Sequence, residues 1–96
     1  MGMRTVLITG VGKGIGKALA EKFLLEKYFV IGTVLSSAVS FLSKNTAIYK
    51  LDLSSGDSIA ECSRAISESG KRIDILINNA GVLLDEDETK IVVEKL

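Results

Sequence analysis

The sequence predicts an α/β fold built on a doubly wound parallel sheet. Short apolar runs alternate four times with segments of helical periodicity along the 96 residues, which is the pattern of strands joined by helical crossovers. The runs are apolar almost throughout, as expected for strands covered by helices on both faces. Right-handed crossovers favour the strand order 3-2-1-4, with a crevice between the first and fourth strands.

The first half of the chain contains two strands and two helices. A strand over 4–9 is followed by a helix over 14–27, and a strand over 29–34 is followed by a short helix over 37–44. The longer helix is expected because apolar residues recur there at intervals of three and four. These residues are Ile15, Ala18, Leu19, Phe23 and Leu24.

A third strand over 47–51 ends at Asp52 and leads into a helix. The run Ser54-Ser55-Gly56-Asp57 is typical of a helix start, because short polar side chains accept hydrogen bonds from the N–H groups of the first turn. Gly70 is expected to end this helix. Its apolar stripe consists of Ile59, Cys62, Ala65 and Ile66.

The fourth strand is expected over 73–77 and runs into Asn78-Asn79-Ala80-Gly81. A last helix begins at the acidic run 85–88. Acidic residues in a first turn interact favourably with the helix dipole, which explains the run better than a metal site does. The apolar residues that follow fit packing within one subunit or against a second subunit: Ile91, Val92, Val93 and Leu96.

Composition excludes several classes of function. Twelve basic and twelve acidic residues give a net charge of zero, and no basic block is present, so nucleic acid and anionic membranes are not expected partners. The absence of histidine excludes a Ser-His-Asp triad and a His-ligated zinc site. A single cysteine fits a reducing, cytoplasmic compartment, and no apolar run is long enough to cross a bilayer.

The first strand is followed directly by the glycine loop Thr9-Gly10-Val11-Gly12-Lys13-Gly14-Ile15-Gly16. Glycines allow a tight turn and a close approach of the backbone to phosphate, and the helix that follows directs N–H groups at an anion. A P-loop is excluded because Gly16-Lys17 comes one residue too late and Ala18 cannot bind magnesium. The common dinucleotide-binding pattern Gly-x-Gly-x-x-Gly does not match either, because Ile15 occupies the position of its last glycine. A dinucleotide loop and an ordinary strand-to-helix turn remain.

Asn78-Asn79-Ala80-Gly81 would be a simple turn signal by itself. Its place after the fourth strand puts it at the same sheet edge as the glycine loop. Small residues at that edge leave room for a ribose or a nicotinamide ring. The sequence therefore predicts two motifs that border one crevice.

Both motifs resemble those of the short-chain dehydrogenase/reductase family, which has a Rossmann-type sheet, a Thr-Gly-x-x-x-Gly-x-Gly loop and an Asn-Asn-Ala-Gly strand end. The likeness covers essentially all of this chain, as the N-terminal, dinucleotide-binding part of one domain (1–96). It implies that the loop from Gly10 through Gly12 and Lys13 to Gly14, Ile15 and Gly16 binds a pyrophosphate. It also implies that Asp52 and Leu53 contact adenine and that Asn79, Ala80 and Gly81 line a ribose. For Asp52, a role in helix entry is the alternative.

Residues after the second strand bear on the choice of cofactor. An NAD-preferring site places an acidic residue there, whereas this chain has Val34-Leu35-Ser36-Ser37. Lys13 in the glycine loop and Ser36 are groups that suit a 2′-phosphate. We therefore expect NADP(H), with NAD(H) as the alternative.

The resemblance implies an oxidoreductase that transfers a hydride between the cofactor and a small carbonyl or alcohol substrate. The family's catalytic Ser and its Tyr-x-x-x-Lys pair are not found in these 96 residues, since Tyr28 is followed by Gly32 and Tyr49 by Leu53. We expect this stretch to bind cofactor but to be inactive alone. We also expect the protein to form a homo-oligomer. A non-catalytic dinucleotide-binding module or regulator is the alternative function.

Overall fold

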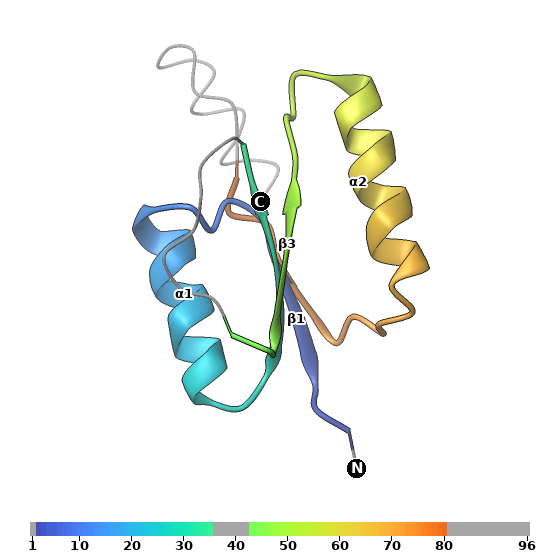
Figure 1. The fold of residues 1–96 in the computed structure, drawn as a ribbon. Helices are drawn as coiled ribbons and strands as arrows, with labels where there is room; N and C mark the ends of the chain where they lie inside the picture. Colours follow the sequence, from blue (N-terminus) through green and yellow to red (C-terminus); the bar gives the residue numbers. More distant parts are fainter. Residues whose placement is uncertain (1, 36–42, 81–96) are drawn as a thin grey trace.

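The computed structural model describes residues 2–35 and 43–80, which form one parallel four-stranded sheet (Figure 1). The strand order is β3-β2-β1-β4, which confirms the predicted doubly wound order 3-2-1-4. The strands are β1 (Thr5–Ile8), β2 (Phe29–Val34), β3 (Thr46–Lys50) and β4 (Ile75–Ile77).

Strand register brings the ends of the strands to one edge of the sheet. Ile8 of β1 lies beside Gly32 of β2 on one side and Ile77 of β4 on the other. Because all pairs are parallel, the segments that leave β1 and β4 begin next to each other. The glycine loop and residues 78–80 are these two segments.

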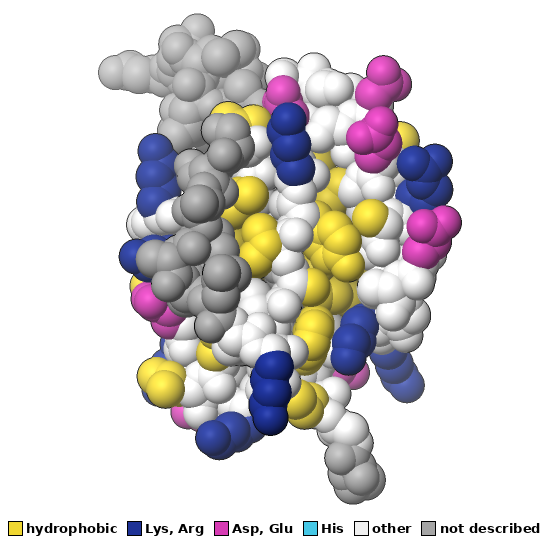
Figure 2. All heavy atoms as spheres, in the orientation of Figure 1, with side chains coloured by type: hydrophobic (Ala, Val, Ile, Leu, Met, Phe, Trp, Pro, Cys, Tyr) yellow, Lys and Arg dark blue, Asp and Glu magenta, His cyan; other side chains and the backbone are white. Residues whose placement is uncertain are grey.

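Helices α1 (Gly14–Leu25) and α2 (Gly56–Glu68) cover opposite faces of the sheet (Figure 1). The core under α1 is fully buried and consists of Val6, Ile8, Val11, Ala20 and Val30. On α2 only Cys62 is buried, and Ile59 is 42% exposed. Figure 2 shows hydrophobic side chains gathered along the β3 edge, between the two helices.

The strand boundaries of β1 and β3 lie within one residue of the prediction, but two other boundaries differ from it by two residues. Helix α1 ends at Leu25 and not at Lys27, because Lys27 takes a left-handed backbone (φ +69°) and the Tyr28 N–H donates to the Phe23 carbonyl. Strand β4 begins at Ile75, two residues later than predicted. The reason is that the Asp74 carboxylate accepts a hydrogen bond from the Thr5 N–H at 2.8 Å, while the Asp74 N–H donates to the Thr5 carbonyl oxygen.

The predicted apolar stripe of α1 was partly wrong. Helix α1 buries the side that carries Gly16 and Ala20, so Ala18 is exposed and Ile15 is 72% exposed. Ser36, Gly81, the last predicted helix and most of the predicted helix over 37–44 lie outside the described residues. Neither α1 nor α2 is long and apolar enough to cross a membrane.

Candidate functional site

The glycine loop turns twice through backbone conformations that favour glycine. Gly10 has φ +73° and Gly14 has φ +64°. A Cβ on Gly10 would lie 3.1 Å from the Cα of Ala80, so the loop also passes close to the segment after β4. Between the two turns Val11 is fully buried against Gly32, which anchors the loop in the core. The loop is therefore a fixed part of the fold.

Gly16 brings the first turn of α1 against the glycine loop. A Cβ at this position would overlap the Gly10 carbonyl oxygen and would lie 2.6 Å from Nδ2 of Asn79. No side chain fits there without a movement of backbone. The glycine thus allows the N-terminus of α1 to lie directly beside the ends of β1 and β4.

Hydrogen bonds join the glycine loop to the segment after β4. Thr9 Oγ1 accepts from the N–H groups of Asn79 at 2.9 Å and Ala80 at 3.0 Å. Asn79 Nδ2 donates to the Gly10 carbonyl oxygen at 3.0 Å. The structure therefore brings together the two motifs that the sequence placed at one crevice.

The backbone N–H groups of residues 12–16 have no acceptor among the described residues. Lys13 is the N-cap of α1 with an extended backbone, its side chain makes no capping bond, and the first turn carries no acidic residue. Lys13 and Ile15 are exposed, and a Cβ on Gly14 would meet nothing within 4 Å. Open donors at the positive end of a helix fit a phosphate anion.

Asp52 and Leu53 follow β3, so they lie at the same sheet edge but beyond β2. Asp52 Oδ1 accepts from the Ser54 N–H at 3.0 Å and from Ser54 Oγ at 2.6 Å. These two bonds lower the pKa of Asp52 below its ordinary value. Ser55 caps α2 by accepting from the Ser58 N–H. The contacts give Asp52 a role in helix entry, and Leu53 is 39% exposed.

Thr33, for which the sequence predicted no role, supports the glycine loop from β2. Its Oγ1 accepts from the Gly10 N–H at 3.1 Å, and its carbonyl oxygen accepts from the Val11 N–H at 2.9 Å. The signal available in the sequence was a single hydroxyl near the end of an otherwise apolar strand, FVIGTV.

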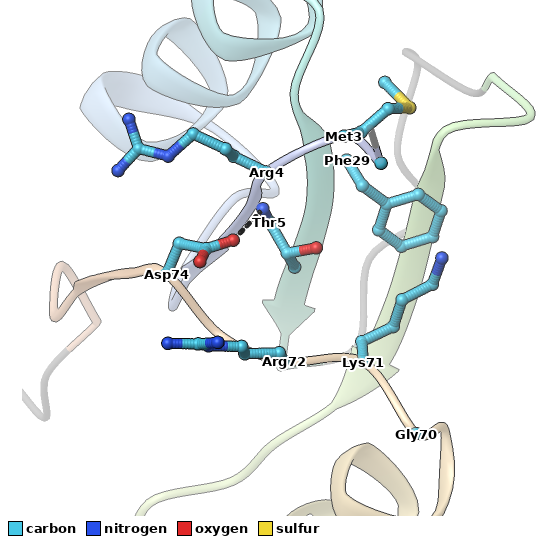
Figure 3. A pocket seen from close by; sticks show the side chains of 9 residues that line it. Met3, Arg4, Thr5, Phe29, Gly70, Lys71, Arg72 and Asp74 are labelled. Atoms are coloured by element: carbon cyan, nitrogen blue, oxygen red, sulfur yellow. Dashed lines mark hydrogen bonds between the residues drawn. The ribbon is translucent and has the colours of Figure 1, made fainter.

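A hollow of about 520 Å³ lies at the opposite, amino-terminal end of the strands (Figure 3). Its cationic residues are Arg4, Lys71 and Arg72. The Lys71 ammonium lies 4.1 Å from the ring centre of Phe29, and the Arg4 guanidinium lies 3.4 Å from the Tyr28 hydroxyl. Figure 3 shows Lys71 directed toward Phe29 and Arg72 directed away from it. The cations do not converge on one point, so the hollow is not the candidate site.

The chain matches the family model for short chain dehydrogenase over residues 4–95. It therefore belongs to the short-chain dehydrogenase family, and the resemblance inferred from the two motifs is confirmed. The family match and the observed topology agree, because the matched range contains every described strand and helix.

Curated relatives include two reductases. The chain is 39% identical over 87 residues to a 3-oxoacyl-[acyl-carrier-protein] reductase of Buchnera aphidicola, with 85% of this chain covered. It is 40% identical over 88 residues to an NADPH-dependent pterin aldehyde reductase of Arabidopsis thaliana, with 83% covered. In each case the match covers 36% of the relative, so the chain spans little more than a third of their length.

Solved structures show the same fold with nicotinamide nucleotides bound. A short chain dehydrogenase from Leptospira borgpetersenii with bound NAD+ superimposes with a TM-score of 0.74 at 28% identity, covering 95% of this chain and 39% of that one. ElxO with NADP bound gives a TM-score of 0.72 at 28% identity, with coverages of 95% and 43%. The two neighbours hold different nucleotides, so the likeness supports both forms equally.

Proposed function

We propose that this chain is the dinucleotide-binding part of one Rossmann-type domain in an NAD(P)-dependent oxidoreductase. The reaction is hydride transfer between the cofactor and a small carbonyl or alcohol substrate. The observation that carries the proposal is the set of open N–H donors at residues 12–16, held against residues 78–80 by Thr9 and Asn79. The bound nucleotides in the two solved relatives support it.

The glycine loop is assigned to the cofactor's pyrophosphate. Backbone N–H groups of Gly14, Ile15 and Gly16 donate to it, and Gly10 and Gly12 allow the approach. The segment after β4 is assigned to a ribose, through Asn79, Ala80 and Gly81. When bound, the nicotinamide supplies or accepts the hydride.

Asp52 and Leu53 are assigned to the adenine ring. Helix entry occupies only Oδ1 of Asp52 among the described contacts. Oδ2 can then accept from the adenine amino group while Oδ1 keeps its bonds to Ser54. The two interpretations of Asp52 are therefore compatible in one conformation.

For the cofactor we favour NADP(H) over NAD(H). Lys13 is exposed at the N-cap of α1, and no acidic residue occurs over 34–37, where an acid would repel a 2′-phosphate. Ser36 is a further donor for that phosphate. The Arabidopsis relative is an NADPH-dependent reductase, which agrees with this preference.

The test is the ratio of dissociation constants for NADPH and NADH in the intact protein, with and without Lys13→Glu. We expect wild type to bind NADPH more tightly, and the substitution to weaken NADPH binding by about tenfold, because a charge near a phosphate is reversed. NADH binding should weaken less. Lys27→Glu, beyond the far end of α1, is the matched control. Tighter wild-type binding of NADH would contradict the preference.

Catalysis by the intact protein is tested separately. A Tyr-x-x-x-Lys pair in its sequence, together with NADPH oxidation in the presence of small carbonyl compounds, supports the oxidoreductase. Nucleotide binding without turnover, and without the pair, supports a non-catalytic regulator instead. We further propose that the protein is cytoplasmic and forms a homo-oligomer. The mass in solution measures the oligomeric state directly.

A further inference from the structure

Thr33 is one of two buried polar side chains among residues 2–35 and 43–80, the other being Thr5. It is 2% exposed and lies near the carboxyl end of β2, whose other residues carry no side-chain hydrogen-bonding group. A buried hydroxyl is costly unless it is hydrogen-bonded. The hydrogen-bond partner of the Thr33 hydroxyl therefore indicates why threonine occupies this position of β2.

That partner is the glycine loop. Thr33 receives hydrogen bonds from two consecutive N–H groups, Gly10 to its Oγ1 at 3.1 Å and Val11 to its carbonyl oxygen at 2.9 Å. From the other side, Asn79 Nδ2 donates to the Gly10 carbonyl at 3.0 Å. Both polar groups of Gly10 are thus held, one by β2 and one by the segment after β4.

These contacts define where the open donors begin. The N–H groups of Gly10 and Val11 are used by Thr33, whereas those of residues 12–16 have no acceptor in the described parts of the chain. If the Gly10 N–H lost its acceptor, the turn would be held only by the bonds to the Gly10 carbonyl oxygen and from the Val11 N–H. The donors that follow Gly10 would then be positioned less firmly.

We propose that Thr33 is a positioning residue for nucleotide binding, which acts through the Gly10 peptide without touching the nucleotide. The inference rests on the proposed function of the glycine loop. Because the pyrophosphate is common to NADPH and NADH, Thr33 affects both nucleotides equally. This separates its role from that of Lys13, which is assigned to cofactor choice.

The test compares Thr33→Val with Thr33→Ser in the intact protein. Valine keeps the volume and removes the acceptor, so we expect the dissociation constants of NADPH and NADH to rise by a similar factor, about tenfold. Serine keeps the acceptor and should stay within about threefold of wild type. In turnover assays KM for the nucleotide should rise while kcat at saturating nucleotide stays unchanged.

Thr5→Val is the matched control. Thr5 is 4% exposed on β1, at the opposite end of the sheet from the glycine loop, and undergoes the same chemical change. It should leave both dissociation constants unaltered. Amide hydrogen exchange of nucleotide-free protein gives a second readout, in which the Gly10 amide exchanges more slowly than the Lys13 amide in wild type and Thr33→Ser.

Each result has a definite meaning. Binding by Thr33→Val as tight as wild type, or loss of affinity in Thr33→Ser as large as in Thr33→Val, overturns the positioning role. A Gly10 amide that exchanges as fast as that of Lys13 in wild type overturns it even if the valine variant does not fold. Wild-type protein that binds neither nucleotide contradicts the proposed function itself, which the exchange data do not depend on.

Discussion

Substitution of Gly16 by alanine tests how closely α1 packs on the glycine loop. The added methyl group would occupy the position of the Gly10 carbonyl oxygen and approach Asn79 Nδ2 to 2.6 Å. Either the start of α1 moves away or the Asn79–Gly10 hydrogen bond breaks. Both changes disturb the open N–H groups of residues 12–16.

The expected cost follows from three contributions. Overpacking against backbone costs about 1–3 kcal/mol, and loss of the bond between Asn79 and the Gly10 carbonyl costs about 1 kcal/mol. Alanine has the better helix propensity and offsets up to about 1 kcal/mol. We therefore expect the free energy of unfolding to fall by about 2 kcal/mol.

Chemical denaturation of the intact protein at fixed protomer concentration measures this change. The control is Gly56→Ala in the first turn of α2, where a Cβ meets nothing within 4 Å, so stability should be unchanged or slightly higher. NADPH affinity should fall in Gly16→Ala alone. A Gly16→Ala protein with wild-type stability and wild-type NADPH affinity would refute the packing argument.

Two further predictions concern packing in the core and the stability of the protein at acidic pH. Gly32→Ala should lower the free energy of unfolding by about 1–3 kcal/mol, because its Cβ would lie 2.5 Å from Val11 Cγ2. The loss should be smaller in a Val11→Ala background. A double-mutant cycle by chemical denaturation in which the two losses are additive would contradict this contact. The hydrogen bonds from Ser54 hold the pKa of Asp52 below its ordinary 3.8. That stabilisation is complete above pH 3.8 and lost as the pH falls through the lowered value. Asp52→Asn, which keeps an acceptor, should therefore show a smaller loss of stability in acid denaturation curves, and an unchanged acid dependence would refute this.

The strand order was predictable because the alternation of strands and helices, right-handed crossovers and the Rossmann-type arrangement together favour the order 3-2-1-4. Gly10 and Gly14 could be predicted as turn glycines because they lie between an apolar strand and a helix, and each has a left-handed backbone in the structure. Gly16 needed the family pattern as well, since its constraint comes from Gly10 and Asn79 and not from its own φ.

Tertiary contacts were harder to foresee. Thr33 meets Gly10 across 23 positions of sequence, and no pattern within β2 states which loop its hydroxyl will reach. The orientation of α1 was partly mispredicted because Ile15 and Ala18 are apolar but lie away from the sheet. Helical spacing alone cannot show which of several apolar residues will be buried.

The central claim is that the backbone of residues 12–16 binds the pyrophosphate of a nicotinamide nucleotide. A crystal structure of the intact protein with NADPH tests it most directly. We predict pyrophosphate oxygens within hydrogen-bond distance of the N–H groups of Gly14, Ile15 and Gly16. Nucleotide bound elsewhere, for example in the basic hollow near Arg4 and Lys71, would contradict the account.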